Sequence, residues 1–168
     1  MTDMGITEAG HGVDAVVASG GSAVIDAATL TDIVDFVWQT FAGEPGPQRV
    51  GSPTAHEPAD RFAAISIGGA WTATLLVATT DACAARFAGA LLGLAPADVD
   101  PADLDDAFGE LVNVVGGNVK GLVDDPGATL SLPVVAPSRP AVTGGQLTVR
   151  IAYDLGGQAM AWELWERP

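Results

Sequence analysis

Apolar residues recur at helical spacing in two stretches of the first half of the chain. Residues 29–42 have apolar side chains at i, i+3, i+4, i+7, i+8 and i+11, which together form one face of a helix. Gly43 and Pro45 should end this helix. Residues 81–92 show a second helical pattern, which Gly93 should end.

A third and longer helical pattern spans residues 100–124 and separates into two faces. Its apolar face consists of Leu104, Phe108, Leu111, Val112, Val115, Val119, Leu122 and Val123. At about 100° per residue, the opposite face holds, within roughly 60° of Glu110, the residues Asp106, Asn113, Gly117 and Gly121. Each glycine inside a helix costs about 1 kcal/mol relative to alanine, so these glycines need a reason. We interpret the outward face as one cleared of bulk so that another surface can approach it.

Alternation of apolar and polar residues predicts about five strands. The expected strands are residues 61–67, 71–79, 130–135, 146–153 and 158–166. Gly68 and Gly69 suit the tight turn of a hairpin between the first two strands. Pro133 places its strand at a sheet edge or a bulge, because proline cannot donate a ladder hydrogen bond.

These elements predict an α+β fold with two layers. A mainly antiparallel sheet of about five strands should pack against about three helices. Residues 1–26 have little periodicity and are expected to form a flexible arm, while 27–168 form one domain. Residues 43–60 are expected to form a surface loop with room for one short strand.

Composition narrows the range of functions. The chain of 168 residues has a formal net charge of −14, which argues against binding to nucleic acid or an anionic membrane surface. No apolar run is long enough to span a membrane, and the N-terminus lacks the features of a secretory signal. We therefore expect a cytoplasmic protein. Cys83 is the only cysteine, and His11 and His56 have no partner at ligand spacing, so no metal site is expected.

Glu110 and Asn113 are the remaining candidates for chemistry. Three residues apart on a helix, their side chains are neighbours that point the same way. A carboxamide donates and accepts hydrogen bonds at once, so it can orient a water molecule, and a carboxylate can pair with a lysine or arginine of a partner. The alternative is an ordinary solvated helix face.

The residues around this pair resemble the signature of the CheC/CheX/FliY family of chemotaxis phosphatases. The resemblance consists of Asp106-x-x-x-Glu110-x-x-Asn113, then Gly117-Asn118-x-Lys120, then Leu130-Ser131-Leu132-Pro133-x-Val135. A single motif in a single domain with an N-terminal helix is most similar to CheX. The residues before 27 and the segment between Gly43 and Asp60 have no counterpart in that pattern.

The resemblance implies a phosphatase that acts on a CheY-like response regulator. It assigns Asn113 to orienting the water that attacks the phospho-aspartate, and Glu110 to pairing with a lysine of the receiver domain. Asp106, Gly117, Lys120 and Gly121 would contact the receiver, with the two glycines leaving space for its loops. Mg²⁺ is expected on the receiver, so this chain needs no cofactor of its own.

The resemblance also implies a homodimer formed by continuing the sheet from one subunit to the next. A non-catalytic CheX-like module that binds a receiver or only dimerises is the alternative, because a shared fold does not fix function.

Overall fold

The computed structural model describes residues 25–43, 48–49 and 59–167. The helices are α1 (Ala27–Ala42), α2 (Asp81–Leu92) and α3 (Pro101–Gly121), with one 3₁₀ turn, η1 (Pro96–Asp98). The strands are β1 (Gln48–Arg49), β2 (Arg61–Gly68), β3 (Thr72–Thr79), β4 (Thr129–Leu130), β5 (Val134–Ala136), β6 (Gln146–Asp154) and β7 (Ala159–Arg167). The expected α+β class is confirmed.

All strands belong to one antiparallel sheet. Its order is β1-β6-β7-β3-β2-β4, and β5 also pairs with β2. The predicted strand over residues 130–135 is two short strands on the outer edge of β2, and Pro133 lies between them. The edge position expected from Pro133 is confirmed. Within the loop of residues 43–60, β1 is the short strand for which the sequence left room.

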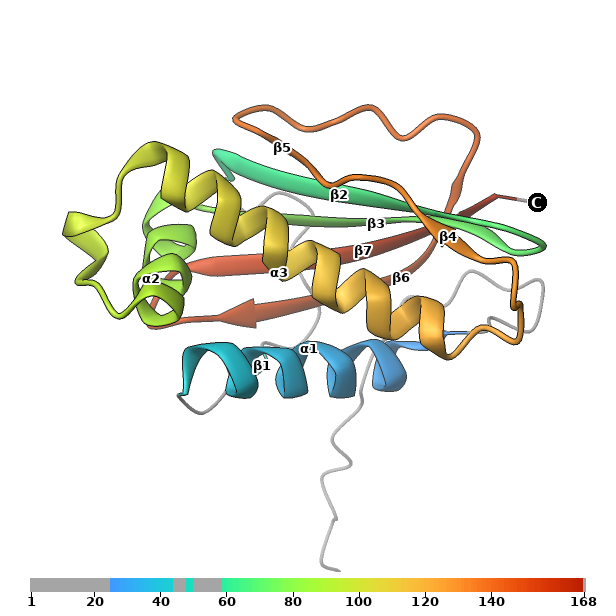
Figure 1. Ribbon diagram of the computed structural model, residues 1–168, viewed down its shortest axis with the longest axis horizontal. Helices are drawn as coiled ribbons and strands as arrows, with labels where there is room; N and C mark the ends of the chain where they lie inside the picture. Colours follow the sequence, from blue (N-terminus) through green and yellow to red (C-terminus); the bar gives the residue numbers. More distant parts are fainter. Residues whose placement is uncertain (1–24, 44–47, 50–58, 168) are drawn as a thin grey trace, which may run out of the picture.

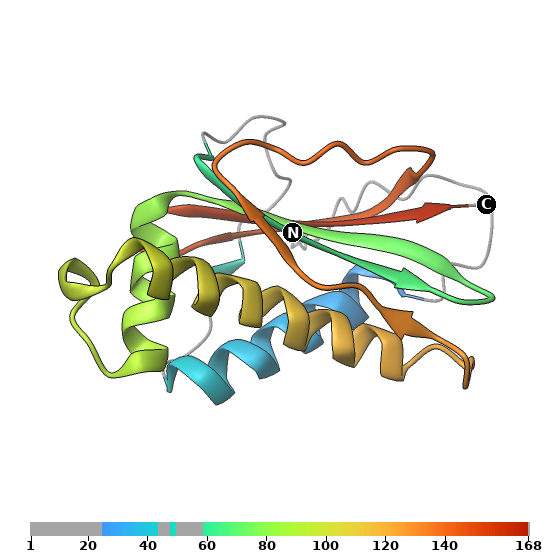
Figure 2. The ribbon, with the colours of Figure 1, turned by 45° about the horizontal axis from the view of Figure 1, so that its top comes forward.

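The three helices lie on one face of the sheet, which gives the molecule two layers (Figures 1 and 2). The core between the layers contains large side chains with at most 2% exposure, among them Trp38, Phe87, Phe108 and Trp162. The segment that connects β5 to β6 crosses the other face of the sheet (Figure 1). Val142 from this segment packs against a smaller cluster that includes Leu76.

The first helix begins two residues before the sequence pattern suggested. The Asp26 carboxylate accepts a hydrogen bond of 2.7 Å from the Thr29 amide and caps α1, and this bond lowers the pKa of Asp26. Ile25 is fully buried in the core. Of the arm predicted for residues 1–26, only these last two residues are described by the structure.

The third helix is shorter than predicted, because it ends at Gly121 and not near residue 124. The amides of Leu122 and Val123 each bond to the carbonyl three residues earlier, which tightens the chain and stops the helix. Leu122, predicted to lie on the apolar face, is 56% exposed as a result.

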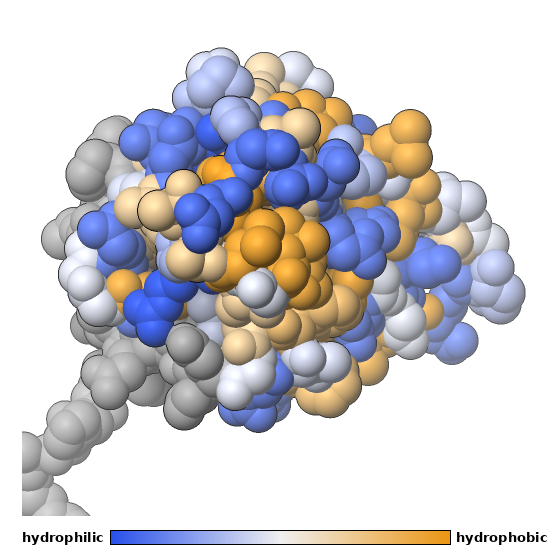
Figure 3. Space-filling model, turned by 60° about the vertical axis from the view of Figure 1, so that its left-hand side comes forward, coloured by the Kyte–Doolittle hydropathy of each residue, from blue (hydrophilic) through white to orange (hydrophobic). Residues whose placement is uncertain are grey.

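Several large hydrophobic side chains remain at the surface. They are Phe36, Leu92, Leu94, Leu122, Leu132 and Val134. Figure 3 shows hydrophobic side chains gathered among hydrophilic ones on the end of the molecule where α2 lies. In the described part of the chain, no helix has the length and apolar character needed to cross a membrane.

Candidate functional site

The candidate site lies on the outward face of α3, and this helix is well defined at its start. Asp100 caps it, since one carboxylate oxygen accepts bonds of 2.9 Å from the amides of both Ala102 and Asp103. Pro101 occupies the first turn, where its missing amide hydrogen has no consequence. The sequence predicted this start.

An ionic contact holds the N-terminal half of α3 against the sheet. Arg61, the first residue of β2, pairs with Asp81 of α2 at 2.8 Å and also with Asp105 of α3. Its hydrogen bond to Asp81 raises the pKa of the guanidinium further. Arg61 was not among the residues predicted from the sequence, where its only signal is that basic residues are rare in this chain.

A close packing contact holds the C-terminal half of α3. Gly116 lies against Ile65 of β2, and a Cβ placed on this glycine would be 2.8 Å from Ile65 Cγ2. Real Cβ atoms essentially never approach another atom so closely, so Gly116 lets the helix approach the strand. The contacts at Asp105 and Gly116 lie on either side of the Glu110–Asn113 turn and leave it little freedom to shift.

Glu110 and Asn113 meet on the outer surface, as their spacing predicted. Asn113 Nδ2 donates a long hydrogen bond of 3.4 Å to Glu110 Oε2. Glu110 is exposed and Asn113 is half-buried, so both can be reached from outside. The pair presents a carboxylate and a carboxamide side by side. It has no nucleophile of its own, and what it can do is accept a cation and orient a water molecule.

The other predicted residues lie on the same helix but at different distances from this pair. Asp106 is exposed one turn before Glu110, and Gly117 follows one turn after Asn113. Lys120 and Gly121 occupy the last turn. At 1.5 Å per residue, Lys120 lies about 10 Å along the helix axis from Asn113, about two turns further on.

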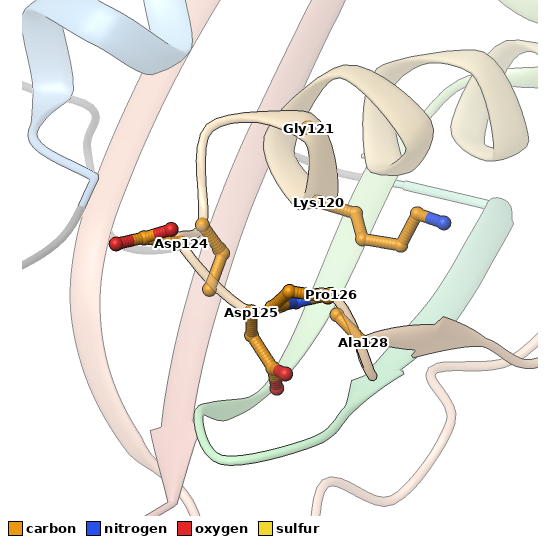
Figure 4. A pocket seen from close by; sticks show the side chains of 7 residues that line it. Lys120, Gly121, Asp124, Asp125, Pro126 and Ala128 are labelled. Atoms are coloured by element: carbon orange, nitrogen blue, oxygen red, sulfur yellow. The ribbon is translucent and has the colours of Figure 1, made fainter.

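An open pocket of ≈ 350 Å³ lies beyond the end of α3. Its lining residues are Lys120, Gly121, Val123, Asp124, Asp125, Pro126 and Ala128. Figure 4 shows Lys120 and Asp124 pointing in different directions, so these opposite charges do not converge on one ligand. The Asp125 carboxylate already has a structural role, because it accepts hydrogen bonds from the amides of Ala70 at 2.7 Å and Gly127 at 2.9 Å.

Of the residues set aside on sequence grounds, the described one, Cys83, provides no second site. Cys83 is a buried residue of α2, and burial raises the pKa of its thiol, which disfavours the reactive thiolate. His11 and His56 lie outside the described residues. Among residues 25–43, 48–49 and 59–167, no group of three or more histidine, cysteine, aspartate or glutamate side chains could hold a metal ion.

Comparison with known families gives one match in sequence. Residues 61–146, which include the whole of α3, match the family model described as chemotaxis phosphatase CheX. No protein of curated function matches the chain in sequence.

Solved structures share the fold. The chain is similar to a chemotaxis protein CheX from Desulfovibrio desulfuricans, with 22% identity and a TM-score of 0.65 over 84% of this chain and 98% of that one. CheX from Vibrio vulnificus has 16% identity and a TM-score of 0.68, covering 82% and 96% of the two chains. CheX from Borrelia burgdorferi, solved with CheY, beryllium trifluoride and magnesium, has 13% identity and a TM-score of 0.68, covering 83% and 96%.

Proposed function

Because this chain belongs to the CheX family of chemotaxis phosphatases, we propose that it accelerates the hydrolysis of a phospho-aspartate on a CheY-like receiver domain. The observation that carries this proposal is the pair of Glu110 and Asn113 on the outward face of a firmly anchored helix. The Borrelia complex shows that a protein of this fold binds CheY.

In the proposed mechanism, α3 lies across the phosphorylation site of the receiver. The Asn113 carboxamide enters that site and orients a water molecule in line with the phosphorus–oxygen bond to be broken. Glu110 pairs with a lysine of the receiver, which fixes the position of α3. The Mg²⁺ that neutralises phosphoryl charge belongs to the receiver. This chain therefore contributes positioning, which can supply a large part of a hydrolytic rate enhancement.

The surroundings of the pair support such an approach. A Cβ placed on Gly121 would meet no atom within 4 Å, and one placed on Gly117 would meet only Leu130 Cδ1, at 4.0 Å. The fold itself does not need glycine at either position. Clearance for the loops of a partner is a reason for accepting their cost in helix stability.

The test is to load candidate receivers with acetyl phosphate and follow the release of phosphate with and without this protein. Asn113→Ala should lower the acceleration by about 10²-fold at saturating protein while the affinity changes little. Asn118→Ala is the matched control, because Asn118 lies on the same helix but its side chain bonds to the Val114 carbonyl at 2.8 Å. Equal decay with wild type and Asn113→Ala would refute the phosphatase and favour a non-catalytic receiver-binding module.

Glu110 should act through binding. Glu110→Ala removes the partner of the receiver lysine and should raise the Kd for the receiver by about tenfold or more. Unchanged affinity in a calorimetric titration would remove this role from Glu110. Homodimer formation belongs to the same proposal and is tested separately by mass in solution.

A further inference from the structure

We propose that Leu132 is a docking residue for the receiver domain, an apolar contact beside Asn113 that sets affinity and leaves the chemical step unchanged. This inference rests on the proposed function. Its starting point is exposure: the Leu132 side chain is 85% exposed, more than that of any other large hydrophobic residue described. A leucine held so far into water on a structured segment suggests a surface that is covered in a complex.

The backbone at Leu132 is held in place on both sides. The Ser131 amide donates to the Ser66 carbonyl at 2.9 Å, and the Ser66 amide donates to Ser131 Oγ at 3.0 Å. Pro133 follows directly and restricts the backbone angle φ. The exposure of Leu132 therefore follows from the fixed backbone of this edge segment and not from a freely moving loop.

The pairing register explains how the edge directs Leu132 outward. Leu130 pairs with Ile67 and Val134 pairs with Ala64, so the edge advances four residues while β2 advances three. The extra residue makes a bulge, which bends a strand locally and redirects its side chains. Sequence alone indicated the bulge through Pro133 but not which side chain it would expose.

The same segment runs beside the catalytic turn of α3. At one end of the segment, Leu130 Cδ1 would lie 4.0 Å from a Cβ placed on Gly117. At the other end, Pro133 Cγ would lie 3.6 Å from a Cβ placed on Gly109. Asn113 lies midway between these two glycines on α3. Leu132 therefore flanks the helix at the level of Asn113.

A receiver domain placed over Asn113 would have to cover this flank. A helix is about 10–12 Å across, whereas a stable interface buries about 800 Å² on each partner. The outward stripe of α3 is too narrow to supply that area, so the partner must extend onto the neighbouring segment. A second copy of this chain fits the edge less well, because Pro133 and the shortness of β4 and β5 oppose backbone pairing there.

The experiment compares binding and turnover for substitutions at Leu132. The probe is the receiver domain that the protein dephosphorylates, loaded with beryllium trifluoride for binding and with acetyl phosphate for turnover. Leu132→Ser should raise the Kd about tenfold and leave the rate at saturating receiver within about twofold, and Leu132→Met should restore most of the affinity. Leu92→Ser is the matched control, since Leu92 is 45% exposed on α2, away from this segment.

Each outcome decides a separate question. If Leu132→Ser binds the loaded receiver as wild type does, or if Leu92→Ser weakens binding equally, the inference is wrong while the phosphatase proposal stands. A change in self-association, seen by sedimentation of Leu132→Ser alone, would assign this edge to a second copy and also overturn it. If the wild-type protein neither binds nor accelerates any receiver, the proposed function fails and the inference fails with it.

Discussion

At the scale of single residues, the four glycines of α3 serve different purposes. Gly116 is required by the fold, since its hydrogen atoms allow contact with Ile65, and Gly109 lies at ordinary contact distance from Val135 Cγ2, 3.4 Å from an added Cβ. Gly117 and Gly121 have open space. The sequence showed that glycine is enriched in this helix. Only the neighbouring side chains in the structure distinguish the glycines that pack against the sheet edge, Gly109 and Gly116, from those with open space, Gly117 and Gly121.

This difference predicts opposite effects of alanine. Gly121→Ala and Gly117→Ala should each raise the free energy of unfolding, by up to about 1 kcal/mol, because alanine is the better helix former. Gly116→Ala should lower it by about 1–3 kcal/mol, because Ile65 is a buried, stiff side chain that cannot move away. Urea unfolding followed by circular dichroism measures both.

The same variants test the clearance argument. Gly117→Ala and Gly121→Ala should bind the phosphorylated receiver less tightly although they are more stable. If the outward face of α3 were only solvated and did not contact the receiver, both variants would bind as tightly as wild type. An unchanged Kd in both variants would leave these glycines without a role in docking.

At the scale of elements, local signals were enough to predict most boundaries. Asp100 before Pro101 predicted the start of α3, and Gly93, with a φ of 70°, ends α2 as expected. Pro133 predicted an edge. Each of these features depends on residues within one turn of the boundary, which is why the sequence alone can reveal them.

The end of α3 could not be predicted in this way. The apolar pattern continues through Leu122 and Val123, but Asp125 bonds across to Ala70 in the turn between β2 and β3. Because this hydrogen bond joins residues 55 positions apart in the chain, the sequence near the end of α3 gives no indication of it. The Glu110–Asn113 pair, by contrast, was predictable because both residues belong to one turn of one helix.

This long-range contact predicts that Asp125, although it lines a pocket, has a structural role and not a ligand-binding one. Asp125→Ala removes the acceptor of the Ala70 and Gly127 amides, which are exposed so that water can partly replace it, and should lower the free energy of unfolding by about 1 kcal/mol. Asp124→Ala, at an exposed neighbouring position, should change it by less than about 0.5 kcal/mol. Equal stability of the two variants in urea would show that the bonds of Asp125 do not hold the turn in place.

At the scale of the whole molecule, the sheet has two unlike edges. The edge formed by β4 and β5 is short and interrupted by Pro133. At the other edge, β6 has nine residues, and in the described part of the chain β1 pairs only with Tyr153 and Asp154. Backbone groups along the rest of β6 could pair with another strand, and an edge of this kind is where one sheet continues into another.

We therefore expect the proposed homodimer to form through β6. Sedimentation equilibrium should give twice the 17.0 kDa mass of the chain. Amides of residues 146–152 should exchange with deuterium more slowly at concentrations above the dimer dissociation constant than below it, because pairing satisfies them. Amides of residues 129–136 at the other edge serve as the internal control and should not change. A monomer at every concentration would exclude the dimer, and protection confined to residues 129–136 would place the interface at the edge that carries Leu132.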